Sequence, residues 1–171
     1  MAWQADHYHT QVAFIVKHLG MMSVRGHFND VTVTGTIDPV TPANTAVEVT
    51  AQMASITTNN PNRDNDIRSS NFLGADEFPT MTFKSTSVEG HGDHYHLNGD
   101  LTIKGVTKPI TLDMTMLGEF NDPNMGHRYG YSGSATISRK DYGMSFSPML
   151  DGKLVVGDEV QISLEGEIIE K

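Results

Sequence analysis

Apolar and polar residues alternate in this chain, and the alternation begins close to the N-terminus. Val12, Phe14 and Val16 share one parity, whereas Gln11 and Lys17 take the other. A period of two is typical of a β-strand with one face turned toward a dry interior. Because the pattern returns as far as the C-terminus, we expect a set of one-sided strands that must curl around a shared interior.

Eight segments carry this pattern, and turns rich in glycine, proline and asparagine separate them. We predict strands at residues 8–19, 24–37, 45–54, 80–89, 94–104, 106–118, 128–138 and 158–169. They are longer than the usual strand of about five or six residues. Long strands at regular spacing favour a closed barrel over a sandwich, because closure removes the exposed edges. The expected fold class is therefore all-β, an antiparallel eight-stranded barrel.

One segment departs from the alternation and predicts a short helix. Polar residues followed by a proline form a helix-start signal, because proline is favoured in the first helical turn. We expect the helix over residues 62–70, with Ile67 facing inward and Arg63, Asp64 and Arg68 on polar flanks. Such a helix can plug the mouth of a barrel or cross its outer surface, and the residues alone do not separate these two positions.

Composition excludes several functional classes. The 171 residues fit a single domain spanning 1–171, and the absence of cysteine excludes disulfides and thiolate chemistry. A formal net charge of -9 opposes binding to nucleic acid. No apolar run approaches the ~18 residues of a membrane span, so stable membrane insertion is not expected. No signal peptide is recognised, which predicts a cytoplasmic protein, or a periplasmic one if the sequence was trimmed.

Three patterns resemble reactive or metal-binding motifs, but each lacks a required part. The histidines of segment His91–His96 lie at the edge of a predicted turn, and a metal site needs three or four converging ligands. Residues 64–66 begin like a calcium loop, but Ser69 stands where a glycine is needed. Segment 130–134 lacks the spacing and the strand-to-helix turn of a nucleophile elbow. We therefore expect no metal, no cofactor and no catalytic residue.

Five motifs in chain order resemble the YceI-like family, bacterial lipocalin-like proteins known for binding polyisoprenoids. They are His9–Leu19, Val24–Phe28, Asn62–Pro79, Gly99–Lys108 and Ile137–Gly143, and together they span nearly the whole chain. The resemblance implies an antiparallel eight-stranded lipocalin-like barrel with one short helix near its mouth. It also implies a long apolar ligand in the barrel lumen and a homodimer.

A lumen of this kind needs apolar side chains on the inward parity of its strands. The residues expected to line it are Val12, Phe14, Val16, His18, Phe28, Val49, Met53, Ile67, Phe72, Phe83, Leu101, Ile103, Ile110, Leu112, Met114 and Tyr131. Small residues at inward positions are expected to leave free volume; these are Gly26, Ala51, Gly133 and Gly166. The candidates to meet an anionic head group are the basic residues Arg63, Arg68, Lys104 and Lys108.

The expected function is non-catalytic binding, storage or transport of a long-chain isoprenoid or fatty-acyl lipid. Two alternatives stay open. One is a stress-related interaction protein whose barrel is solid, and the other is an enzyme that acts on a bound lipid through His9 or His18. The hollow or filled state of the interior separates the first alternative from a lipid carrier.

Overall fold

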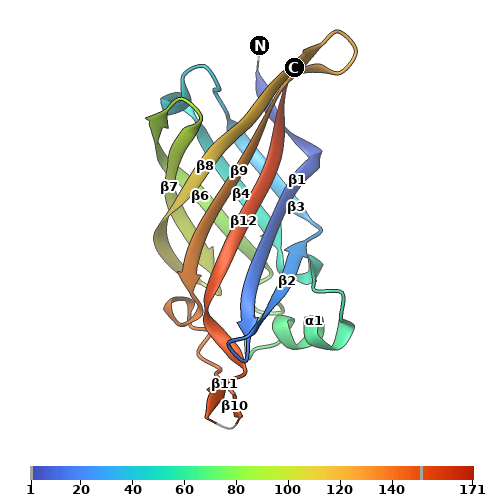
Figure 1. The fold of residues 1–171 in the computed structure, drawn as a ribbon, viewed down its shortest axis with the longest axis vertical. Helices are drawn as coiled ribbons and strands as arrows, with labels where there is room; N and C mark the ends of the chain where they lie inside the picture. The colour runs from blue at the N-terminus through green and yellow to red at the C-terminus, as the bar shows by residue number, and fades with distance from the viewer. Residues whose placement is uncertain (1, 151) are drawn as a thin grey trace.

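A computed structural model of the protein describes residues 2–150 and 152–171, and its main feature is an antiparallel sheet curled into a barrel (Figure 1). Ten strands form this sheet in the order β3-β4-β6-β7-β8-β9-β12-β1-β2-β5. Their bounds are β1 (Trp3–His18), β2 (Met22–Phe28), β3 (Val31–Thr36), β4 (Ala46–Gln52), β5 (Ile56–Thr57), β6 (Thr80–His91), β7 (His94–Ile103), β8 (Val106–Asp122), β9 (Gly126–Ser138) and β12 (Val156–Glu170). A separate hairpin pairs β10 (Met149–Leu150) with β11 (Lys153–Leu154).

The barrel has two distinct ends. The upper end, as drawn in Figure 1, contains both chain termini and the β8–β9 turn. The lower end contains the β1–β2 turn, the β10–β11 hairpin and the helix α1 (Pro61–Arg68). Each of the eight predicted strands has a counterpart in the wall, so the all-β barrel with one short helix is confirmed, although the strand count differs.

The count differs because the predicted strand 24–37 is divided into β2 and β3. At the division, the backbone N–H of Asn29 donates to the carbonyl oxygen of Ser55 at 3.1 Å, and that of Asp30 donates to its Oγ at 3.0 Å. The chain changes partner there: β2 pairs with the lower half of β1, and β3 pairs with β4. One bent segment thus joins both ends of the sheet order and completes the wall.

The upper half of β1 also departs from a regular ladder. Its register against β12 shifts between Ala5 and Thr10, which marks a β-bulge. Beyond the bulge, Trp3 forms an isolated antiparallel bridge with Ile37, just after β3. The bulge therefore lets β1 leave the line of β2 and reach β3 at the top of the barrel.

The helix α1 begins one residue earlier than predicted. The Asn60 side chain accepts a hydrogen bond from the backbone N–H of Arg63 at 3.1 Å, which caps the first turn, and Pro61 is the first helical residue. Asp64 is buried, so the prediction that it occupies a polar flank is wrong: its Oδ1 accepts from both the N–H and the Oγ1 of Thr58, at 2.8 and 2.6 Å.

Among the described residues, no helix has the length and apolar character to cross a membrane.

Three 3₁₀ helices complete the fold: η1 (Pro42–Asn44), η2 (Met53–Ser55) and η3 (Arg139–Tyr142). The last of them has a structural role in the wall. β8 and β9 are paired only from Asp113 and Ser134 upward, and η3 contacts both strands and β12 below that point. The fully buried Tyr142 of η3 belongs to the hydrophobic core, so η3 covers the region where the two strands separate.

At the upper end, His127 lies between two carboxylates. Its Nε2 is 2.6 Å from Glu119 Oε1, and its Nδ1 is 3.3 Å from Glu170 Oε2. The hydrogen bond to Glu119 is the main cause that raises the pKa of His127 above its ordinary value. The contact therefore ties the β8–β9 hairpin to the end of β12 while His127 is protonated.

This contact predicts a pH dependence of stability. A raised pKa in the folded state means that the stabilisation is fully present below the ordinary histidine pKa of about 6.5 and is lost as the pH rises through the folded value. We expect the melting temperature to fall across this window by more in the wild type than in His127→Gln. Thermal melts at a series of pH values test this, and parallel curves for the two proteins would contradict it.

Candidate functional site

The interior of the barrel holds three cavities in a row. An upper chamber of about 160 Å³ and a lower chamber of about 270 Å³ lie on either side of a waist of about 50 Å³. The waist shares Val49, Phe83, Leu112 and Leu164 with the upper chamber, and Val12, Met81 and Ile162 with the lower one. Since a cavity needs about 10–15 Å³ by this measure to hold one water, all three cavities, including the waist, exceed that threshold. The interior is therefore hollow, with a constriction.

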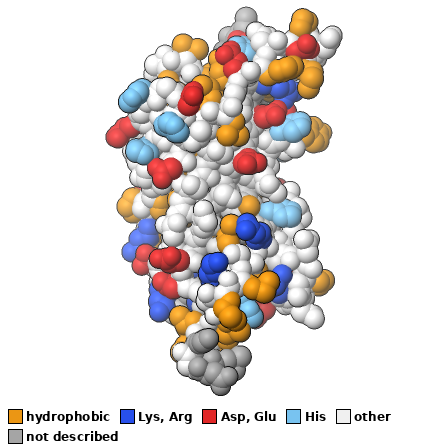
Figure 2. All heavy atoms as spheres, in the orientation of Figure 1, with side chains coloured by type: hydrophobic (Ala, Val, Ile, Leu, Met, Phe, Trp, Pro, Cys, Tyr) orange, Lys and Arg blue, Asp and Glu red, His pale blue; other side chains and the backbone are white. Residues whose placement is uncertain are grey.

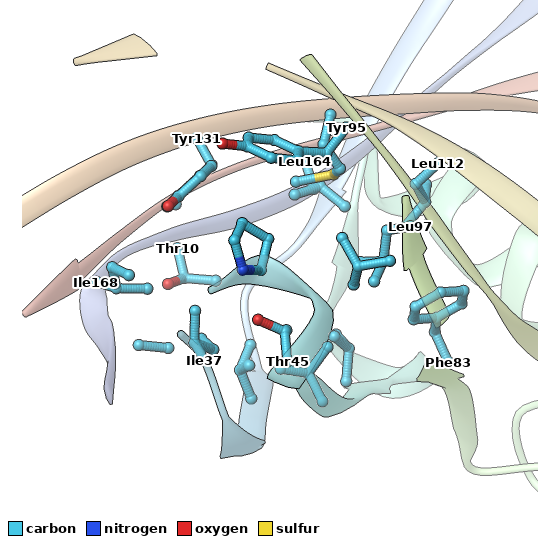
Figure 3. Close-up of a pocket in the computed structure, with 18 of the residues that line it drawn as sticks. Thr10, Ile37, Thr45, Phe83, Tyr95, Leu97, Leu112, Tyr131, Leu164 and Ile168 are labelled. Carbon is cyan, nitrogen blue, oxygen red and sulfur yellow. The ribbon is translucent and has the colours of Figure 1, made fainter. Parts of the chain in front are cut away.

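The upper chamber is almost wholly apolar. Figure 3 shows Phe83, Leu97 and Leu112 at one side of it and Thr10 and Ile168 at the other. Burial raises the pKa of Tyr131, which also lines this chamber, to about 12. Its phenol therefore stays neutral at physiological pH. The chamber offers a long apolar surface, and its few polar lining residues carry hydroxyl groups or, at Asp38, Glu165 and Glu167, carboxylates.

Large inward side chains lie flat against glycines on the neighbouring strands. A Cβ atom at Gly26 would overlap Cζ of Phe14, and one at Gly133 would overlap Sδ of Met114. Gly99 is covered in the same way by Phe83. The expectation that Gly26 and Gly133 leave free volume is wrong, because neighbouring side chains occupy that space. The open volume exists because these side chains are held against the wall.

This arrangement predicts the effect of Gly133→Ala. The new methyl group must displace the flexible Met114 side chain into the upper chamber, which Met114 lines. We expect the longest isoprenoid alcohol that competes with a fluorescent prenyl probe to become shorter, while short alcohols compete as before. Overpacking is expected to cost about 1–3 kcal/mol of unfolding free energy.

A matched control exists on the same strand. A Cβ atom at Gly130 would meet only Cβ of Leu117, at 3.8 Å, which is an ordinary contact. Gly130→Ala should therefore leave the chain-length preference unchanged. Equal chain-length profiles for the two variants would contradict the displacement of Met114.

The lower chamber differs from the upper one in its charged groups. Lys17, Arg63 and Arg139 line it together with His18, and Asp66 is the acidic residue in its lining. Its remaining lining is apolar and includes Ile67 of α1, so the helix forms part of the chamber wall beside the lower mouth. The interior thus has a chemical direction, with hydroxyl groups and the carboxylates of Asp38, Glu165 and Glu167 at the upper end and mainly cations at the lower end.

Arg139 is a buried cation held by carbonyl groups. Its side chain donates to the carbonyl oxygens of Gly157 at 2.8 Å, Met144 at 2.8 Å, Phe146 at 2.9 Å and Val156 at 3.3 Å. Burial lowers the pKa of Arg139. These bonds fix the segment after η3 to the start of β12, and Met144 in that segment lines the lower chamber. Arg139 is thus a positioning residue for the lower chamber wall.

The structure brings most of the predicted lumen residues together around these cavities. Those that line at least one cavity are Val12, Phe14, Val16, His18, Phe28, Val49, Ile67, Phe72, Phe83, Leu101, Ile103, Ile110, Leu112, Met114 and Tyr131. Met53 is different: it is fully buried in η2, in the hydrophobic core, and is not part of the lining. That these residues contact a ligand stays a prediction.

The four head-group candidates are dispersed. Arg63 lines the lower chamber, although its Nε and Nη2 already donate to Thr58. Arg68 donates to Asn65 and to backbone carbonyls, and Lys104 donates to the carbonyl of Ser70 at 3.0 Å. Lys108 is exposed, and it lines none of the three interior cavities of the described residues. Only Arg63 of the four is therefore positioned at the lumen.

Sequence reasoning missed several lining residues. Tyr95 and Leu97 share the inward parity of Leu101, so the alternation of β7 contained the signal for both. Ile37 and Thr45 line the upper chamber from the ends of the β3–β4 connection, where no periodic pattern exists. Other omissions include Lys17 and Arg139, whose positions at the lower chamber depend on tertiary contacts.

His9 and His18 do not form a common site. His18 lines the lower chamber, whereas His9 lies at the upper bulge of β1, with its Nδ1 3.0 Å from Asp6 Oδ2. Asp6, His9 and Glu167 come close enough to suggest a metal site. However, Arg128 Nη1 contacts Asp6 at 2.6 Å and Glu167 at 3.1 Å, and it is the main cause that lowers the pKa of Asp6. This cluster is therefore an ion-pair network around a guanidinium.

Comparison with known proteins identifies the family. A YceI-like domain matches residues 3–168. A UPF0312 protein from Pseudomonas paraeruginosa is 43% identical over 136 residues, which cover 80% of this chain and 71% of that protein. A UPF0312 protein from Yersinia pestis is 39% identical over 137 residues, with the same coverage of 80% and 71%.

Solved structures have the same fold. The YceI protein of Campylobacter jejuni has a TM-score of 0.78 and 30% identity, covering 91% of this chain and 90% of its own. Burkholderia cenocepacia BcnA has a TM-score of 0.83 at 22% identity, covering 96% and 99%. A polyisoprenoid binding domain from Saccharophagus degradans has a TM-score of 0.71 at 13% identity, covering 100% and 99%. The sequence match over nearly the whole chain, together with the hollow barrel, makes this protein a member of the YceI-like family.

Proposed function

We propose that this protein binds a long-chain isoprenoid, or a similar amphiphilic lipid, inside the barrel and carries or stores it without chemical change. The observation that carries this proposal is the row of three apolar cavities, because the inward faces of the strands leave an interior that is open rather than solid. Membership of the YceI-like family supports it, as does the shared fold of a polyisoprenoid binding domain.

The shape of the interior favours a chain over a compact ligand. A waist of about 50 Å³ lined by Val12, Phe83 and other apolar residues suits a narrow, flexible tail that occupies both chambers. A fused-ring molecule would fill one chamber and stop at the constriction. Discrimination among ligands is therefore expected to follow chain length.

Burial of the tail can supply the affinity. At roughly 0.8 kcal/mol per buried CH₂, a five-carbon prenyl unit contributes about 3–4 kcal/mol before the costs of binding. A few such units already approach the limit of about −20 kcal/mol that non-covalent complexes respect. The head group then mainly sets the orientation. The cations Lys17 and Arg63 favour an anionic head at the lower chamber and a tail that extends upward.

The decisive experiment is native mass spectrometry of the purified protein before and after extraction with organic solvent. A carrier is expected to show an adduct that the extraction removes, and the extract should contain an intact lipid of the corresponding mass. Recovery of modified products would favour an enzyme. The apo mass alone, together with no uptake of added isoprenoid alcohols, would overturn the proposal.

A further inference from the structure

We propose that the lower end of the barrel docks reversibly on a bilayer surface, so that a lipid enters the lower chamber directly from the membrane. The docking surface consists of exposed apolar residues at that end: Met21 (65% exposed), Met22 (72%), Phe146 (42%) and Met149 (55%). The route of entry rests on the proposed lipid-binding function. The docking itself does not, because it concerns only the outer surface of the protein.

Backbone hydrogen bonds hold these residues in one place. The N–H of Leu19, which lies two residues before Met21 in the β1–β2 turn, donates to the carbonyl oxygen of Val155 at 3.0 Å. The N–H of Val155 in turn donates to the carbonyl oxygen of Pro148, next to Met149, at 2.9 Å. The two exposed methionine segments are therefore neighbours, although they are far apart in the sequence. Met21 and Met149 belong to one patch rather than to separate loops.

The patch adjoins the opening of the lower chamber. His18 and Val155 line that chamber: the carbonyl oxygen of His18 accepts from the N–H of Met21, and Val155 bonds to Leu19 and Pro148, which lie beside the patch residues in sequence. Exposed apolar surface beside a polar rim marks an interaction site. Unbranched methionine side chains adapt to irregular apolar surroundings such as the boundary between head groups and acyl chains. A surface of this kind lets an acyl or prenyl tail move into the chamber without crossing water.

Charge distinguishes the lower end from the upper end. Figure 2 shows acidic side chains mostly in the upper half of the visible face and basic side chains mostly in the lower half. The acidic residues at the upper end include Asp6, Asp38, Glu89, Asp93, Glu119, Asp122, Glu167 and Glu170. At the lower end the basic residues Lys17, Arg25, Arg63, Arg68, Lys104 and Lys140 accompany the acidic residues Asp66, Asp76, Glu77, Asp141 and Glu159, so both signs of charge are mixed there. An anionic bilayer therefore repels the upper end and tolerates the lower one.

The length of the barrel keeps the acidic upper end far from a membrane that the lower end contacts. β1 has 16 residues, which at the usual rise per residue amounts to about 50 Å. The Debye length at physiological ionic strength is about 8 Å. When the lower end touches a membrane, the acidic upper end lies several Debye lengths away and opposes docking only weakly. The upper end also exposes apolar residues, namely Tyr8, Val40, Leu117, Phe120 and Met125, but they share that end with the excess of carboxylates. This contrast selects the lower patch as the membrane contact.

Vesicle flotation with matched variants tests the proposal. The full chain is mixed with vesicles of phosphatidylcholine and phosphatidylglycerol, and the protein that floats with the vesicles is quantified. Met21→Asp combined with Met22→Asp is expected to lower the bound-to-free ratio by about tenfold or more, since burial of one such side chain is worth about that factor. Leu117→Asp combined with Phe120→Asp makes the same chemical change at the other end and should leave flotation unchanged. Far-UV circular dichroism checks the fold of both variants.

The outcomes separate docking from ligand binding. Uptake of a fluorescent prenyl probe added in solution should be the same for the lower-end variant and the wild type, while its uptake from vesicles should be slower. Failure of the probe to bind the wild type would sink the proposed function and leave the flotation result valid. No flotation of the wild type, or an equal loss in both variants, would overturn the docking proposal. So would a shift from dimer to monomer by light scattering in the lower-end variant, because the patch would then bind a second copy.

Discussion

Phe14→Asp is expected to weaken the binding of a fluorescent prenyl probe by about 100-fold or more, because an unpaired carboxylate in an apolar site costs several kcal/mol. Phe14 lines the lower chamber, and its ring lies over Gly26 and 6.0 Å from the ring of Phe28. The substitution also removes ring surface that a tail would cover. A fluorescence titration measures the change, after circular dichroism has established that the variant is folded.

The neighbouring residue supplies the control. Ile15 lies on the opposite face of β1 and is not part of the lining of the three cavities. Ile15→Asp introduces the same charge one position away but outside the lumen, so the probe should bind with nearly wild-type affinity. Unaltered binding by Phe14→Asp would show that the ligand does not occupy the lower chamber. Equal losses in both variants would indicate a general loss of structure.

Arg139→Met should destabilise the protein by about 3–5 kcal/mol. Removing the buried guanidinium leaves the buried carbonyl groups that it bonds without a hydrogen-bond donor. Arg139 is 3% exposed, and its guanidinium donates to four carbonyl acceptors. Methionine is also unbranched, but it lacks the guanidinium, whose Cζ lies 5.7 Å from the centroid of the Phe72 ring. Urea unfolding measures the loss. Hydrogen exchange should also show faster exchange in segment 143–148, which Arg139 holds in place.

Two further substitutions define the cause. Arg139→Lys keeps the positive charge, but an ammonium group cannot reach four carbonyls in a planar fork, so most of the destabilisation should remain. Lys140→Met changes the adjacent exposed cation and should fall within about 0.5 kcal/mol of the wild type. If Arg139→Met unfolds within about 1 kcal/mol of the wild type, the carbonyl network does not stabilise the lower chamber.

Much of the barrel could be predicted from the sequence, because each strand contains its own alternation. The division between β2 and β3 and the bulge of β1 were harder to predict, although each produces a signal in the sequence. The inward parity changes from Phe28 to Val31, where β2 ends and β3 begins, and again between Ala5 and Thr10, at the bulge of β1. A parity change within a continuous apolar pattern is therefore a sign of a bulge or a bend, and the prediction of one strand over 24–37 passed over it.

The site was only partly predictable, for two physical reasons. Inward apolar residues follow from strand parity, which is why most of the predicted lining lies at the cavities. Charged residues give no such signal, because an arginine is normally exposed and its burial requires partners that only the fold provides. Arg139 has its partners in segments 144–146 and 156–157, and Asp64 has Thr58. Both residues look like surface residues in the sequence.

The flat packing of Phe14, Phe83 and Met114 on glycines has a consequence for evolution and for protein engineering. In most barrels a wider bore requires more strands, which rebuilds the whole wall. Here, bore width depends on pairs of residues on adjacent strands, one bulky and one lacking a side chain. Exchanging the two residues of such a pair, or enlarging the small one, would change the width of the barrel interior at that point while the backbone stays in place. Proteins with this wall could therefore acquire new cargo by a few paired substitutions.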